Sequence, residues 1–201
     1  MRRLLLLVLG LALICPCSVS AAEPEFVILT FEGLPSGAPG KTLLEGLAQR
    51  DAHATFFLWA PPWEQGRRVL DGGHEIGLQA PESLNSLSRR QVAAKLREQQ
   101  ALLPPCQIRY LTVPGNCSDG VRQVARIRHL RFPPGVLDPW AEHPMGQTFL
   151  SRVRTGDTLY LRPATGEDVE QVLNLLDLLQ KRGFRMISLK ESAGFCQVPK
   201  N

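Results

Sequence analysis

The residues Phe26–Phe31, FVILTF, form an unbroken run of apolar and β-branched side chains, which predicts a strand buried on both faces. Further along, Lys41–Arg50 carries three leucines at helical spacing, and His53–Ala60, HATFFLWA, predicts a second apolar strand. A strand, a helix and another strand in this order are typical of two parallel strands joined by a crossover helix. The sequence therefore predicts an α/β protein.

The same alternation continues to the end of the chain. Further strands are predicted at Gly73–Gln79, Ile108–Val113, Asp157–Leu161 and Phe184–Leu189, and helices at Trp63–Leu70, Ser88–Leu103, Ser118–His129 and Glu167–Arg182. Ser88 is the expected N-cap of its helix, and two prolines end it. The segment Pro133–Thr155 is irregular and is interpreted as a long loop with one strand at most. The order predicts a sheet with crossover helices rather than a sandwich.

The first residues have the three parts of a secretory signal peptide. Two arginines follow the first methionine, an apolar run spans Leu4–Ile14, and small residues stand at Ser20 and Ala22. We expect cleavage after Ala22, which divides the chain into a signal peptide, residues 1–22, and one mature domain, residues 23–201. No later segment reaches the roughly 18 consecutive apolar residues that a membrane-spanning helix needs. The sequence therefore predicts a secreted or periplasmic protein without an integral membrane segment after cleavage.

The charge of the chain gives little attraction to nucleic acid. The full sequence has 23 Lys and Arg against 19 Asp and Glu, and cleavage removes two arginines, so the mature net charge is about +2. Arg122, Arg126, Arg128 and Arg131 form a concentrated basic stretch. Because these arginines lack interleaved aromatic residues and share one helix and the turn after it, a solvated helix face is favoured over a phosphate-binding patch. No nucleic-acid partner is expected.

Three cysteines, Cys106, Cys117 and Cys196, follow the predicted cleavage point. In an oxidising compartment two of them are expected to form a disulfide, and the short spacing makes Cys106 with Cys117 the first interpretation. Cys196 is able to replace either partner by pinning the C-terminal tail, so the pairing stays open. None of the spacings resembles a pair of zinc ligands.

The loops that follow the predicted strands are the places to look for a site. Parallel strands that feed helices put their C-terminal ends on one face, where ligands bind in such folds. The loops concerned are Glu32–Pro35, Trp59–Trp63, Gln79–Ser83, Thr112–Asn116, Asp138–Trp140 and Arg162–Thr165.

Five segments carry a family resemblance: ILTFEGLP at Ile28–Pro35, GHEIG at Gly73–Gly77, LNSLS at Leu84–Ser88, GDTLYLRP at Gly156–Pro163 and KRGFRMISLKE at Lys181–Glu191. Their order and spacing resemble those of the polysaccharide deacetylases of the NodB-homology type, the family 4 carbohydrate esterases, over nearly the whole mature chain. The resemblance implies a distorted (β/α) barrel of the glycoside hydrolase and deacetylase type. It also implies removal of N- or O-acetyl groups from chitin-like, peptidoglycan or exopolysaccharide chains.

Catalysis in that family needs zinc or a similar divalent ion, held by one aspartate and two histidines, which polarises the acetyl carbonyl and activates a water. The resemblance puts Glu32 at the position of the base aspartate and Gly33 at that of the metal-binding aspartate. Gln79 stands where the first ligand histidine belongs, and Glu82 or Ser83 near the second, with two residues fewer in between. No metal ligand set is expected, and hence no cofactor.

The supporting residues of the family are also replaced. Its orienting arginine aligns with Thr112 in LTVPG, and its late catalytic histidine aligns with Arg162 in YLRP. Arginine does not give up a proton near neutral pH, so Arg162 is able to stabilise an oxyanion but not to act as the acid. Asp138, in VLDPW, matches the fourth motif of the family. By motif position the candidate catalytic residues are Glu32, Asp138 and Arg162.

Two tryptophans complete the candidate substrate-binding residues. Trp63 and Trp140 are predicted beside the loop face, where indole rings either stack on sugar rings or cap the barrel core, and both interpretations are open. They join Gln79 and Thr112 as candidates by position. Glu32 alone is a poor metal site and is interpreted as a polar loop residue or an acceptor for a sugar hydroxyl.

Three hypotheses for the function follow. The favoured one is an exported protein of the polysaccharide deacetylase type that acts on or binds cell-envelope or extracellular carbohydrate and is catalytically degenerate. The first alternative is an active carbohydrate deacetylase or other hydrolase of C–N bonds with a rebuilt site, using Glu32, Asp138 or His143, which has Glu142 beside it. The second alternative is a structural partner protein of the envelope. The expected partners are accordingly a carbohydrate polymer or an envelope protein.

Overall fold

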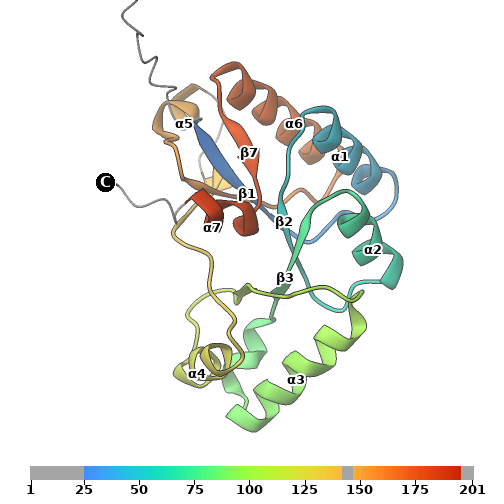
Figure 1. Ribbon diagram of the computed structural model, residues 1–201, viewed down its shortest axis with the longest axis vertical. Helices are drawn as coiled ribbons and strands as arrows, with labels where there is room; N and C mark the ends of the chain where they lie inside the picture. The colour runs from blue at the N-terminus through green and yellow to red at the C-terminus, as the bar shows by residue number, and fades with distance from the viewer. Residues whose placement is uncertain (1–24, 142–146, 196–201) are drawn as a thin grey trace, which may run out of the picture.

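A curled sheet of seven parallel strands organises the chain (Figure 1). The computed structural model describes residues 25–141 and 147–195, and the predicted signal peptide, Glu142, His143 and Cys196 lie outside these ranges. The strands are β1 (Phe26–Glu32), β2 (Thr55–Leu58), β3 (Glu75–Gln79), β4 (Leu111–Thr112), β5 (Val136–Leu137), β6 (Thr158–Leu161) and β7 (Arg185–Ile187). Their order is β4-β3-β2-β1-β6-β5, and β7 also pairs with β1. Because β4 and β5 are the two ends of this order, the sheet is an open barrel.

Helices surround the outer face of the sheet. They are α1 (Ala38–Gln49), α2 (Trp63–Asp71), α3 (Arg89–Leu102), α4 (Asp119–Ile127), α5 (Gln147–Arg152), α6 (Gly166–Lys181) and α7 (Leu189–Phe195), with 3₁₀ turns η1 (Glu82–Ser86) and η2 (Pro139–Ala141). Helices α1 and α6 pack against each other, and α3 and α4 lie together beyond β4 (Figure 1). Within the described ranges, none of the helices combines the length and the apolar character needed to cross a membrane.

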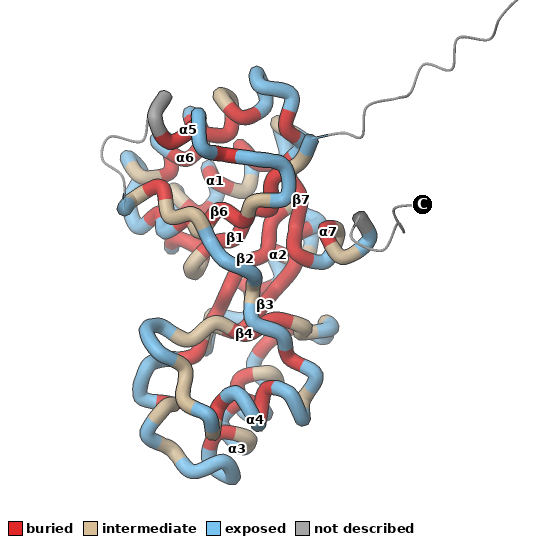
Figure 2. Tube along the Cα trace, turned by 90° about the vertical axis from the view of Figure 1, so that its left-hand side faces the viewer, coloured by how far each residue is buried: buried red, intermediate tan, exposed pale blue. Residues whose placement is uncertain are grey.

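The strands have two different faces because successive side chains point to opposite sides of a sheet. In β1, Val27, Leu29 and Phe31 belong to the large core that the outer helices cover. Between them, Ile28 joins Phe57 in a smaller apolar cluster on the inner side. Figure 2 shows the resulting buried centre of the molecule, with the exposed residues on the surrounding helices and loops. Glu32 continues the alternation of Ile28 and thus belongs to the inner side.

A glycine in β3 makes room for the inner apolar cluster. A Cβ atom at Gly77 would lie 2.5 Å from a ring carbon of Phe57, far inside van der Waals contact. The ring of Phe57 is fully buried, and the register places Phe57 directly beside Gly77. The GHEIG segment therefore ends in glycine because an aromatic ring from the neighbouring strand fills that space.

The order and type of the predicted elements are confirmed, and Ser88 caps α3 in a capping box with Gln91. Two details were wrong. The predicted strand Phe184–Leu189 ends at Ile187, because Ser188 and Glu191 form reciprocal hydrogen bonds that start α7. The predicted long loop before β6 contains the six-residue helix α5. Such a short helix gives too little periodicity to be recognised in a sequence.

The first interpretation of the cysteines is not observed, because Cys106 and Cys117 are both free thiols. Cys106 precedes β4 and Cys117 follows it, so the two cysteines flank opposite ends of that strand. Burial raises the pKa of both thiols, which keeps them protonated and weakly reactive near neutral pH.

Candidate functional site

A cleft of about 580 Å³ opens at the C-terminal ends of the strands, on the inner side of the curled sheet. Glu32 ends β1, Thr112 ends β4 and Arg162 directly follows β6, so three of the predicted site residues line it. The opposite wall is mostly apolar and consists of Val113, Pro114 and the segment 132–136. The arrangement combines a few polar groups with an apolar wall, as ligand sites commonly do.

Glu32 lies at the polar centre of the cleft. The Gln79 amide donates a hydrogen bond from Nε2 to Glu32 Oε1 at 2.5 Å. The Tyr160 hydroxyl donates to the other carboxylate oxygen, Oε2, at 2.9 Å. Both oxygens of the carboxylate are thus already occupied by a protein donor. This orients Glu32 firmly and leaves only its remaining lone pairs for a ligand.

Tyr160 is part of this polar group, although it was not among the predicted site residues. Burial, together with the hydrogen bond to Glu32, raises the pKa of its hydroxyl well above the ordinary value. The phenol therefore stays protonated and acts as a donor to Glu32. The signal for Tyr160 was present in GDTLYLRP, because Tyr160 lies in the predicted strand two residues before Arg162, at the spacing of side chains that share a face of a sheet.

Arg162 and Asp138 form an ion pair at the rim of the cleft, with Arg162 Nη2 2.6 Å from Asp138 Oδ2. The other carboxylate oxygen of Asp138 accepts the backbone N–H of Trp140 at 2.9 Å. Asp138 is thus held by a cation and by the turn η2. Both oxygens of Asp138 therefore have a protein partner, and this geometry suits positioning Arg162.

Thr112 lines the cleft, but its hydroxyl oxygen does not open into it. This oxygen is buried and has no hydrogen-bond partner in the described part of the chain. A buried hydroxyl without a partner is costly, so a bound water is favoured at this point.

The two tryptophans lie away from the cleft lining. Trp63 begins α2 and is 47% exposed, and Trp140 is half-buried and packs against the main core. Neither is among the residues that line the cleft. The aromatic and proline side chains that do line it come from the FPPGV segment, Phe132–Val136, and from Pro114 and Tyr160. Sequence reasoning passed over that segment because it lies in the region interpreted as a long loop.

The residues at Glu32 do not fit a divalent metal ion. A metal would need free lone pairs from several neighbouring ligands, whereas both Glu32 oxygens face N–H or O–H donors. The next residue, Gly33, has no side chain, and Gln79 turns its amide N–H toward Glu32. In the described ranges no three His, Cys, Asp or Glu side chains are grouped closely enough to hold a metal ion. We therefore derive no chemical step that passes through a metal.

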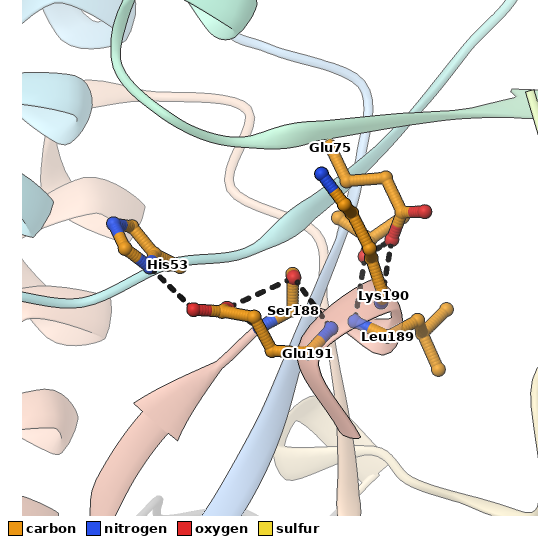
Figure 3. Close-up of polar contacts among 7 residues, drawn as sticks. His53, Glu75, Ser188, Leu189, Lys190 and Glu191 are labelled. Carbon is orange, nitrogen blue, oxygen red and sulfur yellow. Dashed lines mark hydrogen bonds and ion pairs between the residues drawn. The ribbon is translucent and has the colours of Figure 1, made fainter. Parts of the chain in front are cut away.

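A second polar cluster lies at the opposite, N-terminal ends of β2 and β3 (Figure 3). Glu75 Oε2 accepts hydrogen bonds from the Thr55 hydroxyl at 2.7 Å and from the backbone N–H of Lys190 at 2.9 Å. Nearby, His53 Nδ1 lies 2.8 Å from Glu191 Oε1. These contacts tie the beginning of α7 to the sheet. The cluster therefore has a structural role: it holds the C-terminal helix α7 against the sheet.

Solved structures with the same fold were found for this chain. The peptidoglycan deacetylase PdaC from Bacillus subtilis superimposes with a TM-score of 0.71 and 18% identity, over 84% of this chain and 90% of that protein. This chain has the fold of the family 4 carbohydrate esterases. Its resemblance to the family and the predicted barrel class are confirmed at the level of the fold.

Two further structures illustrate the range of proteins with this fold. A family 4 carbohydrate esterase from Streptomyces lividans has a TM-score of 0.66 and 20% identity, over 81% of this chain and 91% of that one. A pseudoenzyme of the same family from Bacillus anthracis has a TM-score of 0.68 and 20% identity, over 84% of this chain and 65% of that one. The sequence matches no protein-family model and no curated protein sequence. The esterase fold is thus compatible with both active and inactive relatives.

Proposed function

We propose that this chain is an exported polysaccharide-binding protein with the esterase fold, and that it has lost metal-dependent deacetylation. The fold and the cleft at the C-terminal ends of the strands support a carbohydrate ligand. The predicted signal peptide supports export to the envelope or the medium. An envelope protein is a further partner that export would allow.

The observation that carries the proposal is the hydrogen bonding of Glu32. Gln79 and Tyr160 each donate to one of its carboxylate oxygens, where a metal-dependent site needs open ligands. The next residue, Gly33, has no side chain that could act as a metal ligand. The cleft offers donors and acceptors for sugar hydroxyls, but not a set of ligands for a cation.

The lining of the cleft suits both the apolar face and the polar hydroxyls of a pyranose ring. Phe132 and Val113 offer apolar surface to the C–H face of a sugar, and Glu32 and Arg162 offer an acceptor and donors to its hydroxyls. Sugar hydroxyls in the cleft would thus take the place of water at these two charged groups.

The test is a pair of measurements on the purified chain from residue 23 onward. Acetate release from acetylated chitin-type oligosaccharides, peptidoglycan and xylan is measured with zinc and with a chelator. Binding of the same sugars is measured by calorimetry for the wild type and for Phe132→Ala, with Leu102→Ala as the control, since Leu102 is an exposed apolar residue on α3. We expect no acetate release and sugar binding that Phe132→Ala weakens but Leu102→Ala does not.

The alternatives give different results in the same experiment. Acetate release that Glu32→Gln abolishes would support an active enzyme with a rebuilt site and overturn the proposed loss of activity. Absence of binding to every sugar would leave the structural role as an envelope partner. Export is checked separately by the mass of the mature chain, which we expect to begin at Glu23.

A further inference from the structure

Positive charge is concentrated in one part of the molecule. The segment from Ser88 to Arg131, which holds α3, β4 and α4, has 9 Lys and Arg against 2 Asp and Glu, compared with 23 against 19 in the whole sequence. Helices α3 and α4 lie together at the β4 end of the sheet (Figure 2). We refer to residues 88–131 as the basic lobe.

Little of this charge is neutralised within the chain. In the described ranges, the ion pair that the basic lobe contains joins Lys95 to Glu98 at 2.8 Å. Arg122 donates instead to a neutral acceptor, the backbone carbonyl of Cys117, at 3.1 Å. Arg122 and Arg126 are both exposed and four residues apart on α4, a spacing at which like charges repel each other. Both arginines stay exposed in the fold despite this repulsion. An anionic partner that binds between them would relieve it.

The basic lobe is continuous with the cleft through Phe132. This side chain is 37% exposed and lines the cleft on one side. It also lines a hollow of about 260 Å³ whose other walls are Arg122, Arg126 and Leu130. A ligand long enough to leave the cleft over Phe132 therefore meets two guanidinium groups.

Further arginines extend the same surface. Helices α3 and α4 enclose a hollow of about 440 Å³ on the other side of α4. Its lining includes Arg89, Arg90, Arg97 and Arg128, together with Ile127, which is 70% exposed. The arginines thus come from two helices and not from α4 alone.

We propose that the polysaccharide held by the cleft is anionic, and that its carboxylate or phosphate groups contact Arg122 and Arg126. This inference rests on the proposed function, which it extends by naming the substrate class. A guanidinium group binds carboxylate and phosphate oxygens with two parallel hydrogen bonds, so it suits either kind of acidic sugar. Phe132 lies where a sugar ring passes between the cleft and the two arginines.

An anionic membrane surface is the competing partner, and the geometry of α4 disfavours it. Helices that lie on membranes need a broad exposed apolar face beside their charges. Val121, Val124 and Ala125 of α4 are buried in the core, and Ile127 is the exposed apolar residue of this helix. The arginines line hollows rather than a convex face, which suits a linear polymer.

The experiment compares two polymers that differ only in charge. Polygalacturonate and its fully methyl-esterified form are titrated against the purified chain from residue 23 onward, at low and high salt. The site variant is Arg122→Gln with Arg126→Gln. The control is Lys181→Gln with Arg185→Gln, which makes the same charge change at exposed positions in α6 and β7, away from α3 and α4 (Figure 1). Chitin-type oligosaccharides and phosphatidylglycerol vesicles complete the set.

We expect polygalacturonate to bind more tightly than its ester and to weaken with salt. The site variant should lose at least about tenfold in affinity, since hydrogen bonds to charged groups are the strong ones, and the control should keep the wild-type value. Equal binding of both polymers, or equal loss in the two variants, would overturn this inference while sugar binding in the cleft stands. Binding to vesicles but not to polygalacturonate would also overturn it. Failure to bind any sugar, the neutral oligosaccharides included, would overturn the proposed function as well.

Discussion

The burial of His74 predicts a defined loss of stability in mild acid. His74 is 5% exposed, and neither ring nitrogen has a hydrogen-bond partner in the described part of the chain. Burial, with a smaller contribution from the charge of His53, lowers its pKa from 6.5 to about 4, against an opposing effect of Glu191. The unfolded chain therefore takes up a proton as the pH falls through 6.5, while the folded chain takes it up only near pH 4.

The sign and size of the effect follow from this difference. The contribution of His74 is fully present above pH 6.5 and is lost as the pH falls through 4. One pKa unit corresponds to about 1.4 kcal/mol, so the free energy of unfolding falls by about 3 kcal/mol between pH 8 and pH 4 from this residue. Glu75 acts in the opposite direction, because burial raises its pKa and its contribution is lost as the pH rises. A comparison with a variant of His74 is therefore needed to isolate the effect.

The assay is urea unfolding, followed by tryptophan fluorescence, from pH 8 to pH 4. In His74→Leu a side chain of similar volume removes the titrating group and the two unsatisfied nitrogens. As the pH falls from 8 to 4, we expect the free energy of unfolding of the variant to rise by about 3 kcal/mol relative to that of the wild type. His129→Asn is the control, because His129 is exposed with a φ of 56°, which Asn tolerates. Parallel curves for His74→Leu and the wild type would refute the reasoning.

Three further changes test other parts of the structure by the same unfolding assay. Tyr160→Phe removes the hydroxyl donor to Glu32 and should cost about 1 to 3 kcal/mol, and no loss would show that the hydrogen bond is absent in solution. Gly77→Ala places a methyl group 2.5 Å from the ring of Phe57 and should lower the free energy of unfolding by about 1 to 3 kcal/mol. The second change Phe57→Leu should reduce this loss, and if it does not, the clash with the ring is not the cause. Ser88→Ala removes the capping box of α3 and should cost about 1 kcal/mol, with the exposed Ser36→Ala as a control that leaves stability unchanged.

Sequence reasoning pointed to residues that follow the predicted strands as candidates for a site. Glu32, Thr112 and Arg162 line one cleft in the structure, because the C-terminal ends of parallel strands meet on one face. Trp63 and Trp140 were predicted by the same reasoning, but Trp63 begins α2 and Trp140 is the middle residue of η2. The direction of a side chain in such positions depends on packing, which for Trp140 is against the main core.

The wall of the cleft and the hydrogen bonds of Glu32 were not predictable in this way. The segment Phe132–Val136 ends with the first residue of β5, a strand of two residues, and has no periodicity that a sequence pattern reveals. The contacts of Gln79 and Tyr160 with Glu32 join residues 47 and 128 positions apart in the chain. They depend on the curvature of the sheet, which brings the inner faces of β1, β3 and β6 to one point.

Local runs of apolar residues and helical spacing predicted the parallel α/β architecture, because they are properties of neighbouring residues. The sequence also places a glycine after β1 and a glutamine at the end of β3, where the family resemblance implies metal ligands. The surroundings of these positions came from the tertiary structure: two donors on Glu32, an ion pair between Arg162 and Asp138, and an apolar wall. These contacts form between distant segments, so their geometry exists only once the sheet has curled and the loops have packed.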